Sequence, residues 1–235
     1  MTRRVRNVIA VAGIGGEVAP LERLFDELPD SSEDAVAVVG DLGAAWSKGD
    51  TYRSIFRVLG QGGRPTFWVP GPIDAPLGDY LRESYNMEVA FPFLHGVHGT
   101  VALAPGNVLF AGMGGEIVDD PETMRAEEAV LRYPGWEVEY RLRLIREFDS
   151  PEQVFLFTTP PAHKGLPEPG SEVLAELIKT HNPRLVIVAG EQPAQEQLAR
   201  TLVVCPGRLD RGSYALVDLR ARSVEYATLT QQAAV

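Results

Sequence analysis

Short apolar runs alternate in the first part of the chain with segments whose apolar residues recur every three or four positions. The runs at 5–12, 35–39 and 66–69 are rich in β-branched residues and end in glycine or proline turns, which is typical of buried strands. The intervening segments 21–28 and 52–59 carry leucine and aromatic side chains at helical spacing. This order predicts parallel βα units.

The rest of the chain predicts a mixture of helices with parallel and antiparallel strands. Residues 97–104 and 107–113 predict a hairpin about Pro105-Gly106. Further strands are expected at 154–157, 185–189, 201–204, 214–219 and 224–229. Helices are expected at 79–85, 122–130, 136–148 and behind Ser171, a suitable N-cap. No repeat or linker interrupts the pattern, so residues 1–235 are expected to form a single domain.

Composition narrows the function classes. The chain has 22 Lys and Arg residues and 32 Asp and Glu residues, a net charge of −10. This acidic charge argues against binding to nucleic acids or anionic membranes. The single cysteine, Cys205, excludes an intrachain disulfide and a Cys-rich zinc module. No apolar run reaches the ~18 residues of a membrane span, and the basic N-terminal segment leads into a strand rather than into the apolar region of a signal peptide. With a single cysteine, we therefore expect a cytoplasmic location.

The loops after the predicted strands carry the most specific pattern, because sites in α/β folds lie at the carboxyl ends of strands. These loops read, in order, AGIGGE (12–17), VGDLG (39–43), VPGPIDAP (69–76), FTTPPAHKG (157–165), VAGEQPAQ (188–195) and VVCPGRLDRGSYALVDL (203–219). The series resembles the calcineurin-like metallophosphoesterases. In that family the corresponding loops read D-x-H, G-D, G-N-H-[DE], a lone His, G-H-x-H and a P-G-S turn.

The resemblance implies an α/β fold of two packed mixed sheets flanked by helices. It also implies a site at which aspartate and histidine ligands hold two divalent metals that polarise a phosphoryl group. Among the family, the chain is most similar to a bacterial subgroup with the same V-P-G-P-x-D-A-P type of loop. The expected pocket at the family's motif positions consists of Gly13, Gly15, Asp41, Pro72, Ile73, Asp74, Thr159 (or Thr158 beside it), Glu191 and Pro193.

The residue types at these positions do not match the family's metal ligands. Glycine, proline and isoleucine side chains cannot bind a metal, and Asp41 alone keeps a ligand of the pattern, with Glu191 as a substitute carboxylate. We therefore expect no dinuclear centre and at most one weakly bound divalent cation at Asp41 and Glu191. The alternative for Asp41 is a structural carboxylate that binds backbone N–H groups of the next loop.

Other residues near the expected cleft also have two interpretations each. His163 and Lys164 follow two prolines, and they are candidates for phosphate contact and acid–base catalysis or else part of an exposed polar loop. Glu116 is a candidate partner of either residue, or a solvated carboxylate. The glycines of segment 13–16 suit a phosphate-binding loop or, as we favour, a tight turn.

The remaining candidates have structural explanations. Asp74 is expected to stabilise a local turn or cap a helix, because Ile73 replaces the histidine that its family counterpart orients. His95 and His98 lack an acidic or cysteine cluster nearby and are expected to be ordinary loop residues. His181 falls near a helix C-terminus, where the helix dipole favours a cation.

Together these features predict a divergent phosphoesterase homologue that is weakly active or inactive and binds a small phosphorylated ligand or a protein partner. An active phosphoesterase is the alternative, either with one metal at Asp41 and Glu191 or with metal-free chemistry at His163 and Lys164. A second alternative is a structural protein that acts as a homo-oligomer.

Overall fold

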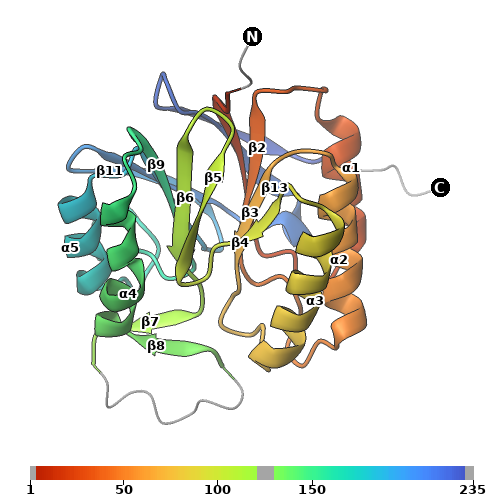
Figure 1. Ribbon diagram of the computed structural model, residues 1–235, viewed down its shortest axis with the longest axis horizontal. Helices are drawn as coiled ribbons and strands as arrows, with labels where there is room; N and C mark the ends of the chain where they lie inside the picture. Colours follow the sequence, from red (N-terminus) through yellow and green to blue (C-terminus); the bar gives the residue numbers. More distant parts are fainter. Residues whose placement is uncertain (1–3, 121–129, 231–235) are drawn as a thin grey trace.

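Two six-stranded sheets pack face to face between two layers of helices (Figure 1). The computed structural model describes residues 4–120 and 130–230. Within these ranges, no helix combines the length and apolar character needed to cross a bilayer. The predicted fold class, a mixed α/β arrangement of two packed sheets, is confirmed.

The first sheet has the order β14-β13-β1-β2-β3-β4. Its strands are β1 (Asn7–Ala12), β2 (Asp34–Val39), β3 (Thr66–Val69), β4 (Leu94–Gly96), β13 (Ser213–Asp218) and β14 (Ser223–Thr228). Strands β1 to β4 run parallel to one another, and β13 and β14 complete the sheet as antiparallel neighbours. The carboxyl ends of four strands therefore meet at one edge.

The second sheet has the order β11-β12-β10-β9-β6-β5. Its strands are β5 (Thr100–Ala104), β6 (Val108–Met113), β9 (Glu152–Phe157), β10 (Leu185–Val188), β11 (Pro193–Leu198) and β12 (Thr201–Pro206). The inner four are parallel, and β5 and β11 are antiparallel edge strands. A small parallel pair, β7 (Glu116–Val118) and β8 (Arg132–Pro134), lies beyond the end of β6.

Side chains along β1 alternate between two apolar layers, as the pleat of a strand requires. Val8 and Ala10 face the layer between the sheets, whereas Ile9 and Val11 face the helices. Between the sheets, the rings of Phe67 and Phe110 stack with centroids 3.8 Å apart. Burial on both faces explains why the central strands read as continuous apolar runs.

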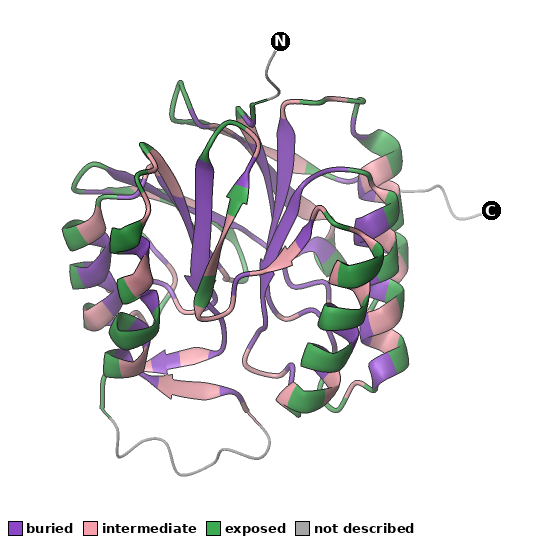
Figure 2. Ribbon diagram, viewed as in Figure 1, coloured by how far each residue is buried: buried purple, intermediate pink, exposed green. Residues whose placement is uncertain are grey.

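Helices cover the outer face of each sheet, and the side of each helix that meets the sheet is buried (Figure 2). The buried residues of these helices include apolar side chains that belong to the core clusters beneath them. The first sheet is covered by α1 (Val18–Glu27), α2 (Gly49–Gln61) and α3 (Leu77–Ala90). The second is covered by α4 (Gly135–Leu142), the 3-10 helix η2 (Arg143–Glu147) and α5 (Glu172–His181). The side chain of Ser171 accepts a hydrogen bond from the Leu174 N–H, which confirms the predicted N-cap.

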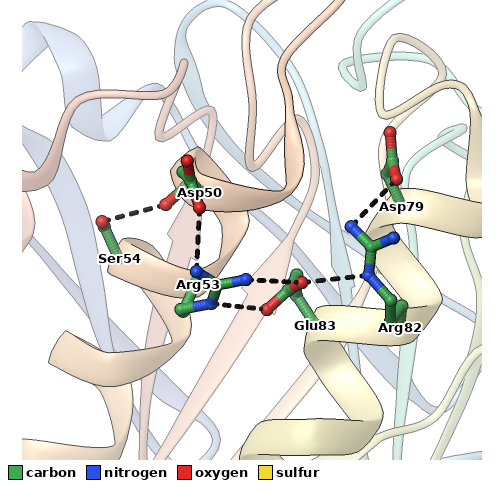
Figure 3. A network of polar contacts seen from close by, with 6 residues as sticks. All are labelled: Asp50, Arg53, Ser54, Asp79, Arg82 and Glu83. Atoms are coloured by element: carbon green, nitrogen blue, oxygen red, sulfur yellow. Dashed lines mark hydrogen bonds and ion pairs between the residues drawn. The ribbon is translucent and has the colours of Figure 1, made fainter.

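A buried carboxylate joins α2 to α3 (Figure 3). Glu83 accepts hydrogen bonds from Arg53 Nε at 2.9 Å and Nη2 at 3.0 Å, and from Arg82 Nε at 3.1 Å. Asp50 and Asp79 complete the network as partners of the two arginines. The bonds from Arg53, followed by those from Arg82, hold the pKa of Glu83 below its ordinary value, although burial raises it. The network fixes the helices that follow β2 and β3.

Several boundaries differ from the sequence predictions. The strand expected from Val97 begins at Thr100, because Gly99 has φ +68° and interrupts the extended backbone. Strands β4, β7, β8 and β11 were not predicted. β11 is a polar edge strand with mainly exposed side chains, so its ladder with β12, rather than burial, defines it. The helix at 136–148 divides into α4 and η2, and the helix expected at 122–130 falls largely on 121–129, outside the described residues.

Candidate functional site

A cleft of about 960 Å³ opens where the carboxyl ends of the parallel strands of both sheets meet. Its floor is formed by the loops that follow β1, β2 and β3, and its walls by β7, β8 and the loops that follow β9 and β10. The side chain of Arg208, between β12 and the 3-10 helix η3 (Leu209–Arg211), completes the lining. The topology therefore brings segments far apart in the sequence into one site.

The cleft collects some of the predicted pocket residues and leaves others out. Those that line it are Gly13, Asp41, Pro72, Thr159 and Glu191, together with Thr158. Those outside the lining are Gly15, Ile73, Asp74 and Pro193. Gly15 lies against Asp210, and Pro193 begins β11 opposite Pro206.

Asp41 ends the turn after β2 and is half-buried at the cleft floor. Its Oδ1 accepts a hydrogen bond of 3.2 Å from the backbone N–H of Ile73. Burial raises the pKa of Asp41, while this hydrogen bond and the charge of Arg208 act in the opposite direction. The carboxylate thus binds the loop after β3, 32 residues along the chain, rather than a backbone N–H of the loop in which it lies.

Asp74 is fully buried below this floor. Its carboxylate accepts hydrogen bonds from the backbone N–H groups of Leu42 at 2.9 Å, Gly43 at 2.7 Å and Gly71 at 2.7 Å. The bond to Gly71 is the local turn that the sequence predicts, but the expected helix cap is wrong, since α3 has Pro76 at its N-cap. Burial raises the pKa of Asp74 to about 6 in spite of the three N–H donors.

Arg208 is a charged residue of the site that the sequence predictions missed, as they also missed Arg132 and Asp119. Its Nε lies 3.0 Å from Asp210 Oδ1, and its Nη1 lies 3.4 Å from Glu191 Oε1. A Cβ built on Gly13 would lie 3.1 Å from Arg208 Cγ and 3.2 Å from its Cζ. The sequence signal that could have identified Arg208 is the charged segment 208–211, which has two arginines and an aspartate directly after the Pro-Gly turn.

Glu191 is an exposed carboxylate at the end of the loop after β10. Besides Arg208, it contacts Arg211, whose Nη1 lies 2.7 Å from Glu191 Oε2. The side chain proposed as a substitute metal ligand is therefore paired with two guanidinium groups.

The opposite wall is held by polar contacts among its own residues. Arg132 Nη2 lies 2.7 Å from Glu116 Oε2, so Glu116 pairs with Arg132 rather than with His163 or Lys164. The hydroxyl of Thr159 accepts a hydrogen bond of 2.7 Å from the Ile117 N–H. These bonds attach the β7–β8 pair to the end of β9.

The N-terminus of α5 also reaches this wall, but a carboxylate already fills it. Asp119 accepts hydrogen bonds from the Ser171 hydroxyl at 2.6 Å and from the Glu172 N–H at 2.7 Å. The helix end, which would otherwise attract an anion, is satisfied from within the chain.

His163 and Lys164 lie in the loop between β9 and α5 but outside the cleft lining. The following residues, Gly165 and Leu166, are the ones that reach the cleft. Lys164 is exposed, and the backbone carbonyl of His163 accepts a hydrogen bond from Leu166. The expected phosphate-contacting pair is therefore displaced from the cleft by the path of the loop.

The other histidines have local structural contacts. His98 Nδ1 accepts a hydrogen bond of 3.1 Å from the Gly114 N–H, and burial lowers its pKa to about 4. The ring of His95 stacks on Phe67. Burial, and secondarily the charge of Arg146, lower the pKa of His181, so the cation expected at this helix end is not favoured.

Comparison with known proteins agrees with this geometry. The family profile described as metallophosphoesterase, calcineurin superfamily, matches residues 1–229. This chain belongs to the calcineurin superfamily of metallophosphoesterases. The predicted resemblance is confirmed.

Solved structures show the same fold. The crystal structure of TT1561 from Thermus thermophilus is 44% identical, has a TM-score of 0.89, and is matched over 96% of this chain and 100% of that one. A second solved chain is 28% identical, with a TM-score of 0.84 over 98% of this chain and 100% of that one. A structure described as a novel archaeal phosphodiesterase is 9% identical, with a TM-score of 0.55 over 95% and 99% of the two chains, and it shows likeness of fold alone. Comparison with curated proteins finds no match.

Metallophosphoesterases imply metal ions, so the fit of the cleft residues to a metal pair can be tested on their chemistry. Across 4–120 and 130–230, no group of three or more His, Cys, Asp or Glu side chains is placed to hold a metal ion. Asp41 and Glu191 share their end of the cleft with a guanidinium, whose positive charge repels a second cation. The residues present in this superfamily member do not fit a dinuclear centre.

Proposed function

We propose that this member of the calcineurin superfamily binds a ligand in the strand-end cleft and does not hydrolyse phosphoesters through a metal pair. The observation that carries the proposal is the guanidinium of Arg208, which lies against Gly13 and pairs with Glu191 inside the cleft. A fixed cation stands among the carboxylates that a metal would need.

The donor chemistry supports the same conclusion. A hard cation such as Mg²⁺ or Ca²⁺ takes about six or more oxygen ligands, and a metal pair needs a bridging carboxylate with further ligands on each side. Asp41 contributes one carboxylate, of which one oxygen already binds the Ile73 N–H. Glu191 is neutralised by two arginines. The neighbouring Gly13 and Pro72 have no ligand atoms in their side chains.

The cleft itself suits a small ligand. Its volume is at the upper end of the range of about 300–1,000 Å³ found for small-molecule sites. Prolines and aliphatic residues form much of its walls, among them Pro160, Pro167, Pro169, Ile117 and Leu166. We infer a ligand with a compact apolar part. A phosphorylated ligand would compete with Glu191 for Arg208, so we expect its affinity to rise in Glu191→Gln.

The catalytic part of the proposal is tested by metal analysis and hydrolysis assays. We expect purified wild-type protein to contain no stoichiometric metal, and to hydrolyse phosphodiester and phosphomonoester substrates with added Mn²⁺ no faster than Asp41→Asn. Stoichiometric metal together with hydrolysis that Asp41→Asn abolishes would establish the single-metal alternative instead. Metal-independent hydrolysis that disappears in His163→Ala or Lys164→Ala would establish the metal-free alternative.

The binding part is tested by thermal denaturation of the protein with a panel of small phosphorylated and apolar compounds. Ala194 on β11 lines the cleft, whereas the adjacent Gln195 does not. A ligand of the cleft should raise the Tm of wild type and of Gln195→Phe, but not that of Ala194→Phe. If no compound separates the two variants and sedimentation shows a stable oligomer, the structural homo-oligomer becomes the better explanation.

A further inference from the structure

A second, smaller pocket lies at the end of the molecule opposite the cleft (Figure 1). It has a volume of about 260 Å³ and is lined by Arg4, Val5, Arg6, Glu152, Leu219 and Arg220. These residues lie at the amino ends of β1 and β9 and directly after β13, whereas the cleft lies at carboxyl ends of strands. Three arginines and one glutamate give the lining a positive charge, although the whole chain has a net charge of −10.

The segment that carries Arg4 is held by the turn between β5 and β6. The backbone N–H of Val5 donates a hydrogen bond of 2.9 Å to the Pro105 carbonyl. Gly106 has φ +88°, and a Cβ at this position would overlap Arg4 Cγ. Glycine therefore gives Arg4 the room to pack against this turn, and the side chain enters the pocket from a fixed backbone.

Arg184 adds positive charge beside the pocket. Its Nε donates a hydrogen bond of 2.6 Å to the Leu219 carbonyl, and its Nη2 one of 2.7 Å to the Arg220 carbonyl. Carbonyl acceptors satisfy the N–H groups but leave the formal charge of the guanidinium in place. Among residues 4–120 and 130–230, neither Arg184 nor Arg220 forms an ion pair with a carboxylate. The turn after β13 therefore contributes charge that the described residues do not neutralise.

The other two arginines of the lining have carboxylate partners but remain open to solvent. Arg4 Nη2 lies 3.1 Å from Glu152 Oε2, and Arg6 Nε lies 3.4 Å from Glu33 Oε1. The side chains of Arg4 and Arg6 are 51% and 58% exposed, and exposed ion pairs contribute little to stability. A guanidinium has more N–H donors than one such contact uses, so both side chains can also bind a ligand.

We propose that this pocket binds a small phosphate-type anion with two or more negative charges through Arg4, Arg6 and Arg220. The planar guanidinium fork matches pairs of phosphate oxygens, which is why arginine is common in such sites. The volume lies just below the range of about 300–1,000 Å³ for small-molecule sites, so it suits one or two phosphoryl groups. The acidic charge of the whole chain disfavours an extended polyanion such as a nucleic acid. The inference is independent of the proposed function, because the two sites lie at opposite ends of the strands.

The test is calorimetric titration of the full-length protein with inorganic pyrophosphate, in a metal-chelating buffer of low ionic strength. Arg220→Gln removes an exposed guanidinium of the lining, and affinity should fall by about tenfold or more with the loss of its charge-assisted hydrogen bonds. Glu152→Gln removes the carboxylate of the lining, and affinity should rise because that carboxylate repels the anion and occupies Arg4. A gain of affinity cannot result from misfolding, and circular dichroism confirms that both variants are folded.

Two controls separate the pocket from general surface charge and from the cleft. Arg222→Gln removes the same charge from the same turn as Arg220, but Arg222 does not line the pocket, so affinity should change little. Ala194→Phe obstructs the cleft and should leave pyrophosphate binding unchanged. The inference is overturned if wild type shows no saturable binding, if Arg222→Gln loses as much affinity as Arg220→Gln, or if Ala194→Phe abolishes binding.

The source of the phosphoryl groups is separated by a second titration with a nucleoside diphosphate. Tighter binding than that of pyrophosphate would identify the anion as part of a larger organic ligand, and equal or weaker binding would identify a free anion. Either result upholds the pocket when Arg220→Gln weakens it. Failure of this inference leaves the proposed function intact, since the latter is tested by metal analysis, hydrolysis and ligands of the cleft.

Discussion

The carboxylate of Asp74 accepts a hydrogen bond of 2.7 Å from the backbone N–H of Gly43, more than thirty residues away in the sequence. The other oxygen of Asp74 accepts from Leu42 and Gly71. One buried side chain therefore holds together the loops after β2 and β3, and these loops carry Asp41 and Pro72 into the cleft. Its contribution can be measured.

Asp74→Asn should destabilise the protein at pH 7. The amide can present only one oxygen, so its NH₂ group would face at least one buried N–H donor in place of an acceptor. An unsatisfied buried donor costs about 1–3 kcal/mol, and more where the lost acceptor is charged. Chemical denaturation followed by circular dichroism measures the change. A free energy of unfolding equal to that of wild type would show that these three bonds do not hold the loops.

The stability contributed by Asp74 should also depend on pH, with a defined sign. Because burial raises the pKa of the folded carboxyl to about 6, the folded protein binds a proton between about pH 4 and 6 that the unfolded chain has released. This contribution to stability is therefore largest near pH 4 and is lost as the pH rises through 6.

Comparison with Asp74→Asn isolates this effect, since the other groups titrate in both proteins. The difference in free energy of unfolding between wild type and Asp74→Asn should be smaller at pH 7 than at pH 4.5. A difference that grows with pH would mean that the three N–H donors outweigh burial.

Gly40→Ala should be among the most destabilising small substitutions in the chain. A Cβ at this position would overlap the backbone nitrogen and the Cα of Gly71, and backbone cannot move aside as a flexible side chain can. We expect a loss of more than about 3 kcal/mol. Gly78→Ala is the control, because nothing lies within 4 Å of the added Cβ in α3 and alanine favours a helix by about 0.5–1 kcal/mol. Equal thermal stability of the two variants would contradict the close approach of the two loops.

Glu83→Gln should lower the free energy of unfolding, because it weakens the contacts between α2 and α3. The contribution of Glu83 should depend on pH in the opposite sense to that of Asp74. Hydrogen bonds from Arg53, and secondarily from Arg82, lower the folded pKa of Glu83, so its contribution is present above the unfolded pKa of about 4.3 and is lost as the pH falls through the folded pKa. Wild type should be more stable than Glu83→Gln at pH 7, and the difference should be smaller at pH 3.5, below the unfolded pKa. Asp50→Asn, which removes the exposed partner of Arg53, should have a smaller effect. Thermal melts at both pH values measure this, and a pH-independent difference would count against the ion pairs.

The elements that the sequence predicted well share one physical feature, which is burial on both faces or along one helical stripe. Val36 and Val38 of β2 face the helices while Ala35 and Ala37 face the second sheet, so the whole strand reads as apolar. Strand β11 shows the converse. Its exposed Gln195 and Gln197 give no apolar signal, and only the ladder with β12 makes it a strand.

The candidate site shows the same division. The order of the strand-end loops, and with it the place of Asp41, could be predicted because each loop follows a strand that the apolar pattern itself predicts. The partner of Gly13 could not be predicted, because Arg208 lies far away in sequence and comes beside Gly13 only where β13, the strand after Arg208, pairs with β1.

The sequence by itself thus determined the superfamily and the order of most strands and helices, and it predicts a mismatch between the cleft residues and the family's metal ligands. These follow from local periodicity and from residue types at fixed positions. The tertiary structure alone decided that Arg208 lies beside Gly13, that Asp74 joins two loops, and that His163 lies outside the cleft lining. Such contacts join distant segments, and only the pairing and packing of the strands brings their atoms within bonding distance.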